Sequence, residues 1–395
     1  MNTQETIGLF EKYVIGNYGR VPIVIVRGAG SRVWDADGRE YIDFFPGWAV
    51  NGLGHCPSRV VERVREQLGN LLHVPNTFYM EPQGLLAEKI STSSFGGKSF
   101  FCNSGTEANE AAIKLARLYG NTKGRNRIIT MLDSFHGRTY ASVAATGQPK
   151  YHKGFDPMVP GFEHVPFNDF AALEAAFDDQ TCAVMLEPVQ GEGGINVASR
   201  EYMQQIRQLC DSNNALLIVD EVQTGMGRTG AMFGYMHFEV EPDIMTLAKT
   251  LGGGIAIGAM VARPALSEYL KPGTHASTFG GNPVAASAAL GVFETIEAED
   301  LCSQAVTRGT QVRKRLEPLV ERTEWMREIR GLGLMLGIEL TVPGQPVVDA
   351  CLDAGLIVNC THETILRIMP AMTVDTETLE AGLDIFCSII EGYQP

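Results

Sequence analysis

The chain has 395 residues, of which 45% are hydrophobic and 20% are charged, as in folded globular proteins and unlike disordered or fibrous chains. Its 32 basic and 46 acidic residues give a formal net charge of −14 without a visible basic stripe, which argues against nucleic acid or an anionic membrane as the main partner. The 43 glycines exceed the usual share of about 7% and gather in short clusters, which suggests tight turns around a ligand. This composition favours an enzyme.

The start of the chain and its apolar runs indicate no export or membrane segment. Residues 1–13 lack the basic and apolar regions of a signal peptide, and the longest apolar runs, such as residues 255–262, are shorter than the ~20 residues of a membrane span. The eight cysteines form no CxxC pair, and the eight histidines form no HExxH motif. We therefore expect a cytoplasmic protein with free thiols and no metal site.

A parallel sheet is predicted in the middle of the chain. Residues 24–44 read as a β-meander that turns at Asp37-Gly38. From about Lys98 onward, short apolar runs alternate with helical patterns, which predicts a mostly parallel sheet covered by helices. The apolar runs are KSFFCN, RIITML, TCAVMLEP, ALLIVDE, DIMTLA and IGAMVA. Ligands bind outside the carboxyl ends of such strands, so the residues after each run are the candidates for a site.

The two ends of the chain are expected to form a second, smaller unit. After about Val284 the pattern changes to long helices, then a strand hairpin near residues 331–340, then a helix ending near Ile390. We expect residues 1–55 to join a small α+β domain made mainly of residues 284–395. Residues 56–283 would form the large α/β domain.

The motif NSGTEAN (residues 103–109) follows one predicted strand and opens a helix. Ser104 and Glu107 have the spacing of a capping box. Free backbone N–H groups, hydroxyls and the positive end of the helix dipole would together bind a phosphate. An ordinary helix cap is an equally good interpretation of this motif alone.

Two charged residues follow two further predicted strands. Asp220 ends the run ALLIVD, where a buried carboxylate needs a partner: a helix cap, a buried ion pair, or a cationic ring nitrogen. Lys249 lies between an apolar run and three glycines, where desolvation lowers its pKa and allows attack on a carbonyl group. Together with the phosphate site, this pair predicts pyridoxal phosphate as the cofactor. The glycines at 225, 227 and 230 match GxGxxG, but four residues separate them from the strand, so we interpret that match as accidental.

Arginines supply candidate carboxylate sites. Arg367 lies within an alternating apolar strand and needs a carboxylate nearby, for which Glu192 in EPVQGEGG is a candidate. Arg138 in SFHGRT is either a surface residue or a substrate contact. We interpret its neighbour His136 as a packing residue or one that supports the site indirectly.

Eight stretches, in order along nearly the whole chain, resemble the class III aminotransferases of pyridoxal-phosphate fold type I. They are GSRVWDADGREYIDF, NSGTEANEAAIKLAR, SFHGRT, EPVQGEGG, DEVQTGMGRTG, LAKTLGGG, STFGGNP and RGLGLMLGIEL. By this resemblance, Lys249 would bind the cofactor and later move the proton, and Asp220 would keep the pyridine nitrogen protonated. Further cofactor contacts would come from Ser104, Gly105, Thr106, Phe135, Val222, Gln223 and Thr278. Of these, Phe135 would stack on the ring, and Thr278 would reach the phosphate from the neighbouring subunit of a homodimer.

The same resemblance implies a set of substrate contacts. Arg138 would bind the α-carboxylate of the amino donor, with Tyr18 and Ser277 beside it. In the second half-reaction, Arg367 would leave Glu192 and bind the α-carboxylate of 2-oxoglutarate.

The activity implied is transfer of the δ-amino group of N2-acetylornithine to 2-oxoglutarate, in arginine biosynthesis. Succinylornithine, succinyldiaminopimelate, ornithine and 4-aminobutyrate are alternative donors of the same class. Two other kinds of function are a nicotinamide oxidoreductase that uses the GMGRTG loop and a non-catalytic binding protein on the same scaffold. Lys249, Asp220 and Arg138 together weigh against the non-catalytic protein, because a scaffold need not keep a desolvated lysine.

Overall fold

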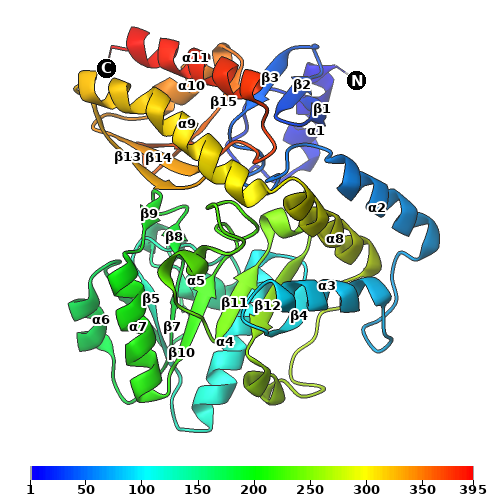
Figure 1. Cartoon of the computed structure of the whole chain (residues 1–395), viewed down its shortest axis with the longest axis vertical. Helices are drawn as coiled ribbons and strands as arrows, with labels where there is room; N and C mark the ends of the chain where they lie inside the picture. Colours follow the sequence, from blue (N-terminus) through cyan, green and yellow to red (C-terminus); the bar gives the residue numbers. More distant parts are fainter. Residues whose placement is uncertain (1, 395) are drawn as a thin grey trace.

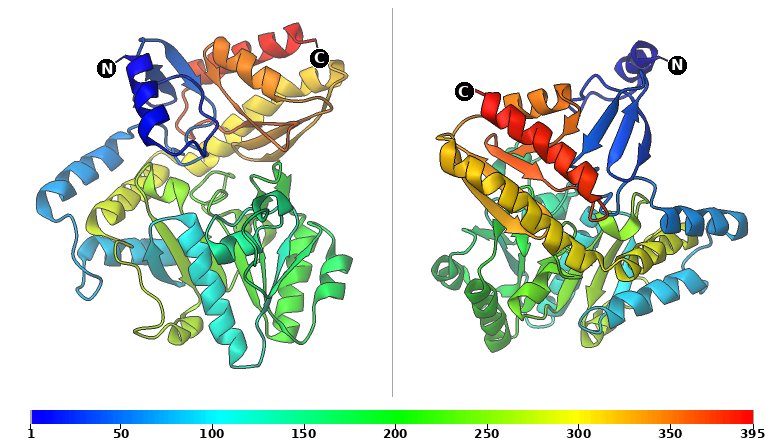
Figure 2. Two further views of the ribbon diagram at one scale, coloured as in Figure 1. Left: turned by 180° about the vertical axis from the view of Figure 1, so that it is seen from behind. Right: turned by 45° about the horizontal axis from the view of Figure 1, so that its top comes forward.

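The computed structural model of the chain describes residues 2–394 and arranges them in two lobes (Figure 1). The lower lobe is built on a seven-stranded sheet. In the upper lobe the N-terminal strands lie beside the C-terminal helices, as the two views of Figure 2 also show. No helix among residues 2–394 is long and apolar enough to cross a membrane. The eight cysteines are free thiols, as expected, and five of them are buried.

The seven-stranded sheet has the strand order β4-β12-β11-β10-β7-β5-β6. Neighbouring strands pair in parallel, except that β12 runs antiparallel to both β4 and β11. The strands are β4 (Lys98–Cys102), β5 (Arg127–Met131), β6 (Phe162–Val165), β7 (Thr181–Leu186), β10 (Leu216–Asp220), β11 (Ile244–Leu247) and β12 (Gly258–Ala262). All six predicted runs belong to this sheet, which confirms the mostly parallel α/β architecture. The sequence does not predict β6, because FEHV is short and half polar.

Helices cover both faces of the large sheet, which explains why its strands read as continuous apolar runs. In β10, Ile218 packs in the cluster that contains the buried face of α4 (Gly105–Asn121). Its neighbours Leu217 and Val219 pack with α7 (Arg200–Asn213) on the opposite face.

The other helices of this part of the chain are α2 (Ser58–Asn70), α3 (Glu81–Thr92), α5 (Tyr140–Ala145), α6 (Phe170–Ala176) and α8 (Pro283–Ala298). Short 3₁₀ helices are η1 (Pro149–Tyr151), η2 (Gly234–Phe238), η3 (Lys249–Gly252) and η4 (Pro264–Tyr269). Helix α8 packs on α2, α3 and η3. The division of the chain at residues 55 and 283 stays a prediction.

Two four-stranded sheets form the upper lobe. In the first, β1 (Ile25–Ala29), β2 (Arg32–Asp35) and β3 (Glu40–Asp43) form the predicted antiparallel meander, and β15 (Leu356–Ile357) pairs in parallel with β3. The second has the order β13-β14-β17-β16 and is made of β13 (Met326–Leu332), β14 (Met335–Leu340), β16 (Asn359–Thr361) and β17 (Ile365–Ile368). The lobe's helices are α1 (Thr3–Tyr13), α9 (Leu301–Arg322), α10 (Gln345–Asp353) and α11 (Thr376–Gly392), and a small hairpin, β8 (Val189–Gln190) and β9 (Asn196–Val197), lies between the lobes.

The structure corrects the C-terminal prediction in two places. The hairpin predicted near residues 331–340 begins earlier, at Met326, because the polar first half of β13 is exposed and lacks an apolar pattern. The last helix ends at Gly392, two residues beyond the predicted end. The strand predicted around Arg367 is β17, whereas β15 and β16 are missing from the sequence prediction because they are only two and three residues long.

Gly382 packs against Phe44 where the C-terminal helix meets the N-terminal strands. Phe44 is fully buried and follows β3, and a Cβ on Gly382 in α11 would overlap its ring. Gly382→Ala should therefore lower stability by about 1–3 kcal/mol through overpacking. The measurement is the urea midpoint of unfolding.

Gly8→Ala in the interior of α1 is the matched control, because a Cβ there meets no atom within 4 Å. Its stability should stay unchanged or rise by up to about 1 kcal/mol. Equal midpoints for the two variants would contradict this account of how the chain ends pack.

Candidate active site

A cavity of about 480 Å³ opens at the carboxyl ends of the parallel strands. It brings together most of the residues that the sequence predicts. Those that line it are Ser104, Gly105, Thr106, Phe135, Arg138, Glu192, Asp220, Val222, Gln223 and Lys249. A cavity of this size suits a small organic ligand.

The start of α4 forms one wall of the cavity. Ser104 is the N-cap, and its hydroxyl accepts the N–H of Glu107 at 3.3 Å, as the capping-box spacing predicts. The Glu107 carboxylate accepts the backbone N–H of Asn103 at 2.6 Å rather than that of Ser104. A Cβ on Gly105 would lie 2.8 Å from Val222 Cγ1, so only glycine lets the helix start approach this wall. The first N–H groups of α4 are therefore available to an anion in the cavity.

The loop that carries Phe135 and Arg138 is fixed to the first turn of α4. The Thr106 hydroxyl accepts the backbone N–H groups of Arg138 at 3.1 Å and Thr139 at 3.2 Å. Gly137 has a φ of +130°, and a Cβ there would overlap the same hydroxyl. The Arg138 guanidinium lies over the Phe135 ring, 5.3 Å from its centroid, at the exposed edge of the cavity. A cation at this edge is well placed to meet a carboxylate from solvent.

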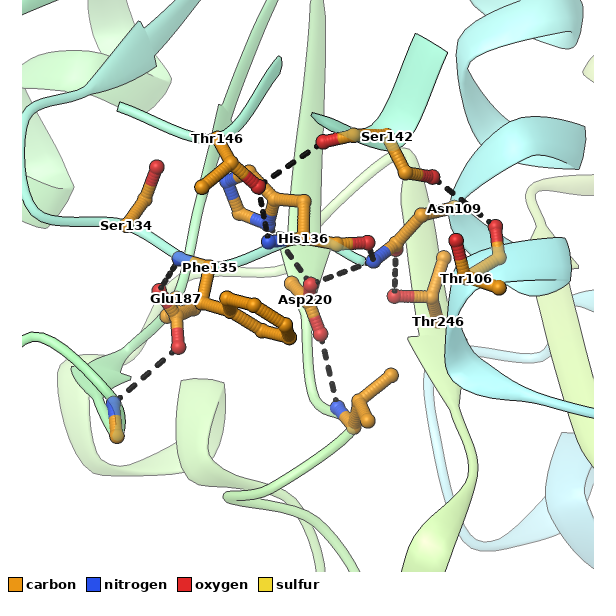
Figure 3. A network of polar contacts seen from close by, with 12 residues as sticks. Thr106, Asn109, Ser134, Phe135, His136, Ser142, Thr146, Glu187, Asp220 and Thr246 are labelled. Carbon is orange, nitrogen blue, oxygen red and sulfur yellow. Dashed lines mark hydrogen bonds and ion pairs between the residues drawn. The ribbon is translucent and has the colours of Figure 1, made fainter. Parts of the chain in front are cut away.

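Asp220 lies at the end of β10 in a network of buried polar groups (Figure 3). Its Oδ2 accepts hydrogen bonds from Asn109 Nδ2 at 2.8 Å and from His136 Nδ1 at 2.8 Å. Its Oδ1 accepts the backbone N–H of Val222 at 3.0 Å. Thr246 in turn donates to Asn109 Oδ1 at 2.7 Å. The carboxylate is therefore oriented from three sides and keeps acceptor capacity on Oδ1 for a donor in the cavity.

Glu187 is a buried residue of the cavity wall that the sequence analysis does not identify (Figure 3). Its carboxylate accepts the backbone N–H groups of Phe135 at 3.0 Å and Gly191 at 3.2 Å. Burial raises its pKa to about 7, with the nearby Asp220 carboxylate adding to the rise and His136 opposing it. The available signal was the same as for Asp220: a carboxylate directly after an apolar strand. Asn109 was also missed, although it is a polar residue on the apolar face of α4.

Lys249 follows β11 and begins η3 with a φ of +48°, a left-handed conformation that is uncommon outside glycine. Such strained backbone is often found at functional positions. Desolvation lowers the pKa of the Lys249 amine, as the sequence predicts, while Glu192 and Asp220 oppose this shift. Because β10 and β11 are neighbours, Lys249 and Asp220 reach the same cavity.

Arg367 and Glu192 form the predicted ion pair. Arg367 Nη1 lies 2.7 Å from Glu192 Oε1, and Nη2 lies 3.3 Å from Oε2, which gives a two-point contact. Asn359, which the sequence analysis does not identify, accepts hydrogen bonds from Arg367 Nε at 2.8 Å and Nη2 at 2.5 Å. Burial alone would raise the pKa of Glu192, but the guanidinium beside it holds that pKa below its ordinary value. Arg367 is therefore a buried cation with one displaceable carboxylate partner.

Four predicted residues do not line this cavity. One is Arg367, which pairs with the lining residue Glu192. The other three are Thr278, Ser277 and Tyr18. Thr278 and Ser277 line a neighbouring hollow, where Ser277 Oγ lies 3.3 Å from Asn103 Nδ2. Tyr18 is 64% exposed and packs beside Arg20 in the segment after α1. The predicted roles of these three residues stay predictions. Among residues 2–394, no group of His, Cys, Asp and Glu side chains is arranged to hold a metal ion.

Comparisons with known proteins identify the family of the chain. The family described as "Aminotransferase class-III" matches residues 13–390. The chain is 48% identical to the acetylornithine aminotransferase of Methanocaldococcus jannaschii over 96% of each chain. It is also 48% identical to the enzyme of that name from Caldanaerobacter subterraneus, over 96% of this chain and 98% of the relative.

Solved aminotransferase structures also superpose on this chain. The ornithine aminotransferase of Toxoplasma gondii superposes with a TM-score of 0.95 at 32% identity, covering 99% of this chain and 95% of that one. The acetylornithine aminotransferase of Elizabethkingia anophelis gives 0.89 at 32% identity, with all of both chains covered. These matches confirm the predicted fold type. The chain belongs to the class III aminotransferases, which are pyridoxal-phosphate-dependent transaminases.

Proposed function

We propose that this chain transfers the δ-amino group of N2-acetyl-L-ornithine to 2-oxoglutarate, forming N-acetyl-L-glutamate 5-semialdehyde and L-glutamate, a reaction of arginine biosynthesis. The observation that carries the chemistry is that Lys249 and Asp220 face one cavity from the ends of neighbouring strands. The choice of donor is supported by the relatives that are 48% identical over nearly the whole chain, both named acetylornithine aminotransferase.

The cavity fits pyridoxal phosphate, the cofactor of this enzyme class. The start of α4 offers its N–H groups to the phosphate, at a place where a Cβ on Gly105 would collide with Val222. Asp220 Oδ1 keeps acceptor capacity for the protonated ring nitrogen. Gln223 Oε1 is buried without a hydrogen-bond partner among residues 2–394, which suits a residue that contacts the ring hydroxyl. When bound, the cofactor withdraws electrons from the reacting carbon of the substrate through its ring.

Lys249 is proposed to bind the cofactor through Nζ and then to move a proton. Its lowered pKa increases the fraction of neutral amine that can attack a carbonyl group. With cofactor and substrate bound, Nζ would take the proton from the substrate carbon that carries the amino group. Asp220, whose carboxylate is held in place by Asn109 and His136, would keep the ring nitrogen protonated.

The two arginines divide the substrates between them. Arg138 at the open edge binds the α-carboxylate of the amino donor, which leaves the distal amine near Lys249. Glu192 neutralises Arg367 during this half-reaction. When 2-oxoglutarate enters, its α-carboxylate replaces Glu192 on the Arg367 fork, so one cavity accepts a donor and an acceptor of different shape.

Other donors remain alternatives to acetylornithine. Ornithine is the substrate named for the Toxoplasma gondii relative, at 32% identity. The other alternative donors are succinylornithine, succinyldiaminopimelate and 4-aminobutyrate. They stay alternatives because few contacts in a binding pocket distinguish such donors. The higher identity to acetylornithine aminotransferases favours the acetylated donor. A cytoplasmic location is part of the same proposal.

We further propose that the enzyme acts as a homodimer with shared active sites. Helix α1 has no buried residue, and large apolar side chains such as Ile15, Phe78 and Tyr79 are exposed. Thr278 lines the hollow next to the cavity rather than the cavity itself. In the dimer, the partner subunit's Thr278 would reach the phosphate of this chain.

Replacement of Lys249 tests the chemistry. Lys249→Ala should reduce turnover by a factor of at least about 1000, because the proton-transferring amine is lost. Borohydride reduction followed by peptide mass spectrometry should find the cofactor on Lys249 in the wild type and on no lysine in the variant.

Lys314→Ala, on the exposed side of α9, is the control and should keep both turnover and the labelled Lys249. Substantial turnover by Lys249→Ala, or labelling of a different lysine in the wild type, would overturn the proposal.

Mixed dimers test the shared site. Lys249→Ala and Thr278→Ala should each reduce activity when expressed alone. In a mixed dimer, one site combines both defects, and the other has an intact Lys249 with an intact Thr278 from the partner. Co-expression with two affinity tags should therefore recover activity from one of the two sites. If Thr278 instead acts in its own chain, every site in the mixed dimer has a defect, and no activity returns.

A further inference from the structure

The Gly-rich loop GMGRTG (residues 225–230) has no part in the cavity described above. The cavity wall includes Val222 and Gln223 but none of residues 225–230. The loop instead lies against the C-terminal part of the chain: a Cβ on Gly227 would lie 3.2 Å from Met372 Sδ, and one on Gly230 would overlap Val306 in α9. Its glycines therefore permit close contact between the lobes. The loop does not lie at a dinucleotide-binding site.

Arg228, at the centre of this loop, is a completely buried cation that has no anionic partner among residues 2–394. It is 0% exposed, and burial is what lowers its pKa, to about 10, so the guanidinium keeps its charge at neutral pH. Nη1 donates to three backbone carbonyl oxygens, those of Pro370 at 2.5 Å, Leu334 at 3.2 Å and Met369 at 3.4 Å. Nε and Nη2 have no partner among residues 2–394. Because an apolar side chain of similar size would avoid the desolvation of a charge here, fold stability alone does not explain this arginine.

Two of the three carbonyl groups belong to the segment that carries Arg367, and the third belongs to a neighbouring hairpin turn. Met369 and Pro370 follow β17 directly, and Arg367 lies within β17. Leu334 lies in the turn of the hairpin whose strand β14 pairs with β17, so that Gly337 is opposite Arg367. The backbone N–H of Leu334 also donates to the Arg228 carbonyl at 3.1 Å. Arg228 thus connects the large lobe to the backbone at the carboxyl end of the Arg367 strand and to the adjoining β13–β14 turn.

We propose that Arg228 is a positioning residue that holds Arg367 at the correct distance from the cofactor cavity for the dicarboxylate acceptor. This inference rests on the proposed role of Arg367. While Glu192, Asn359 and the backbone carbonyl of Gly191 hold the Arg367 guanidinium, its position is determined by these partners. When 2-oxoglutarate displaces Glu192, the guanidinium loses a partner from the large lobe, and the Arg228 contacts then keep β17 in place. Loss of Arg228 should therefore affect the half-reaction with 2-oxoglutarate more than the half-reaction with the amino donor.

The test compares Arg228→Met and Arg228→Lys holoenzymes in the two half-reactions, followed separately by absorbance. Arg228→Met keeps the unbranched stem of the side chain but removes its donors. It should raise the KM for 2-oxoglutarate by about tenfold or more, because small displacements in a binding site have large effects. The half-reaction with the amino donor should change by less than about threefold. Arg228→Lys, which keeps the charge and can reach some of the carbonyl groups, should fall between wild type and Arg228→Met.

Arg117→Met in α4 is the matched control. Arg117 also has a pKa lowered by burial and also donates to a backbone carbonyl, that of Pro160, but it lies outside the cavity wall. It should leave both KM values unchanged. Equal effects of Arg228→Met on both half-reactions, or loss of thermal stability with unchanged KM values, would show a purely structural role and overturn the inference. If Arg228→Met does not fold, Arg228→Lys decides: a selective rise in the KM for 2-oxoglutarate supports the inference, and no change refutes it.

Arg367→Lys separates failure of this inference from failure of the proposed function. If Arg367→Lys raises the KM for 2-oxoglutarate but the Arg228 variants do not, only the positioning role is wrong. If Arg367→Lys leaves that KM unchanged, Arg367 does not bind the acceptor, and both proposals about it fail.

Discussion

The structure depends on the burial of several charged groups around one cavity. Lys249, Asp220, Glu187, Glu192 and Arg367 all lie at or beside it, and an isolated charge at such a place would be strongly unfavourable. Each charge is therefore balanced by a neighbour or by backbone N–H groups. Asp220 is held by Asn109 and His136, Glu187 by two backbone amides, and Glu192 by Arg367. The same arrangement lowers the pKa of Lys249 and raises that of Glu187, so the groups that stabilise the site also set its reactivity.

The fold provides this balance by collecting strand ends and by joining the lobes closely. Asp220 and Lys249 come from adjacent parallel strands, whereas Arg367 comes from the sheet of the upper lobe. Close contact between lobes requires glycine where backbone and side chains nearly touch, as at Gly227 against Met372. The packing between the two lobes, rather than any single strand, thus determines the distance between Arg367 and the cofactor cavity.

Local signals in the sequence were sufficient for much of the site. Asp220 and Lys249 each lie at the end of an apolar run, and residues 103–109 carry a helix-cap pattern. The large sheet and its ligand edge could therefore be predicted from the succession of apolar runs along the chain. Asn109, Glu187 and Asn359 were missed, because their partners come from distant parts of the chain. Glu187 carried the same strand-end signal as Asp220 and could have been found by the same argument. In the proposed dimer, Thr278 would act across the subunit interface, which no pattern within one chain can position.

The most direct test of the central claim is a visible spectrum of the holoenzyme, titrated on separate samples with N2-acetylornithine, ornithine and 4-aminobutyrate. The account predicts that the absorbance of the cofactor bound to Lys249 is converted to that of the aminated cofactor at the lowest concentration by N2-acetylornithine. Conversion at a lower concentration by another donor would contradict the proposed substrate. Absence of any cofactor absorbance, even after pyridoxal phosphate is added, would contradict the assignment of the cavity itself.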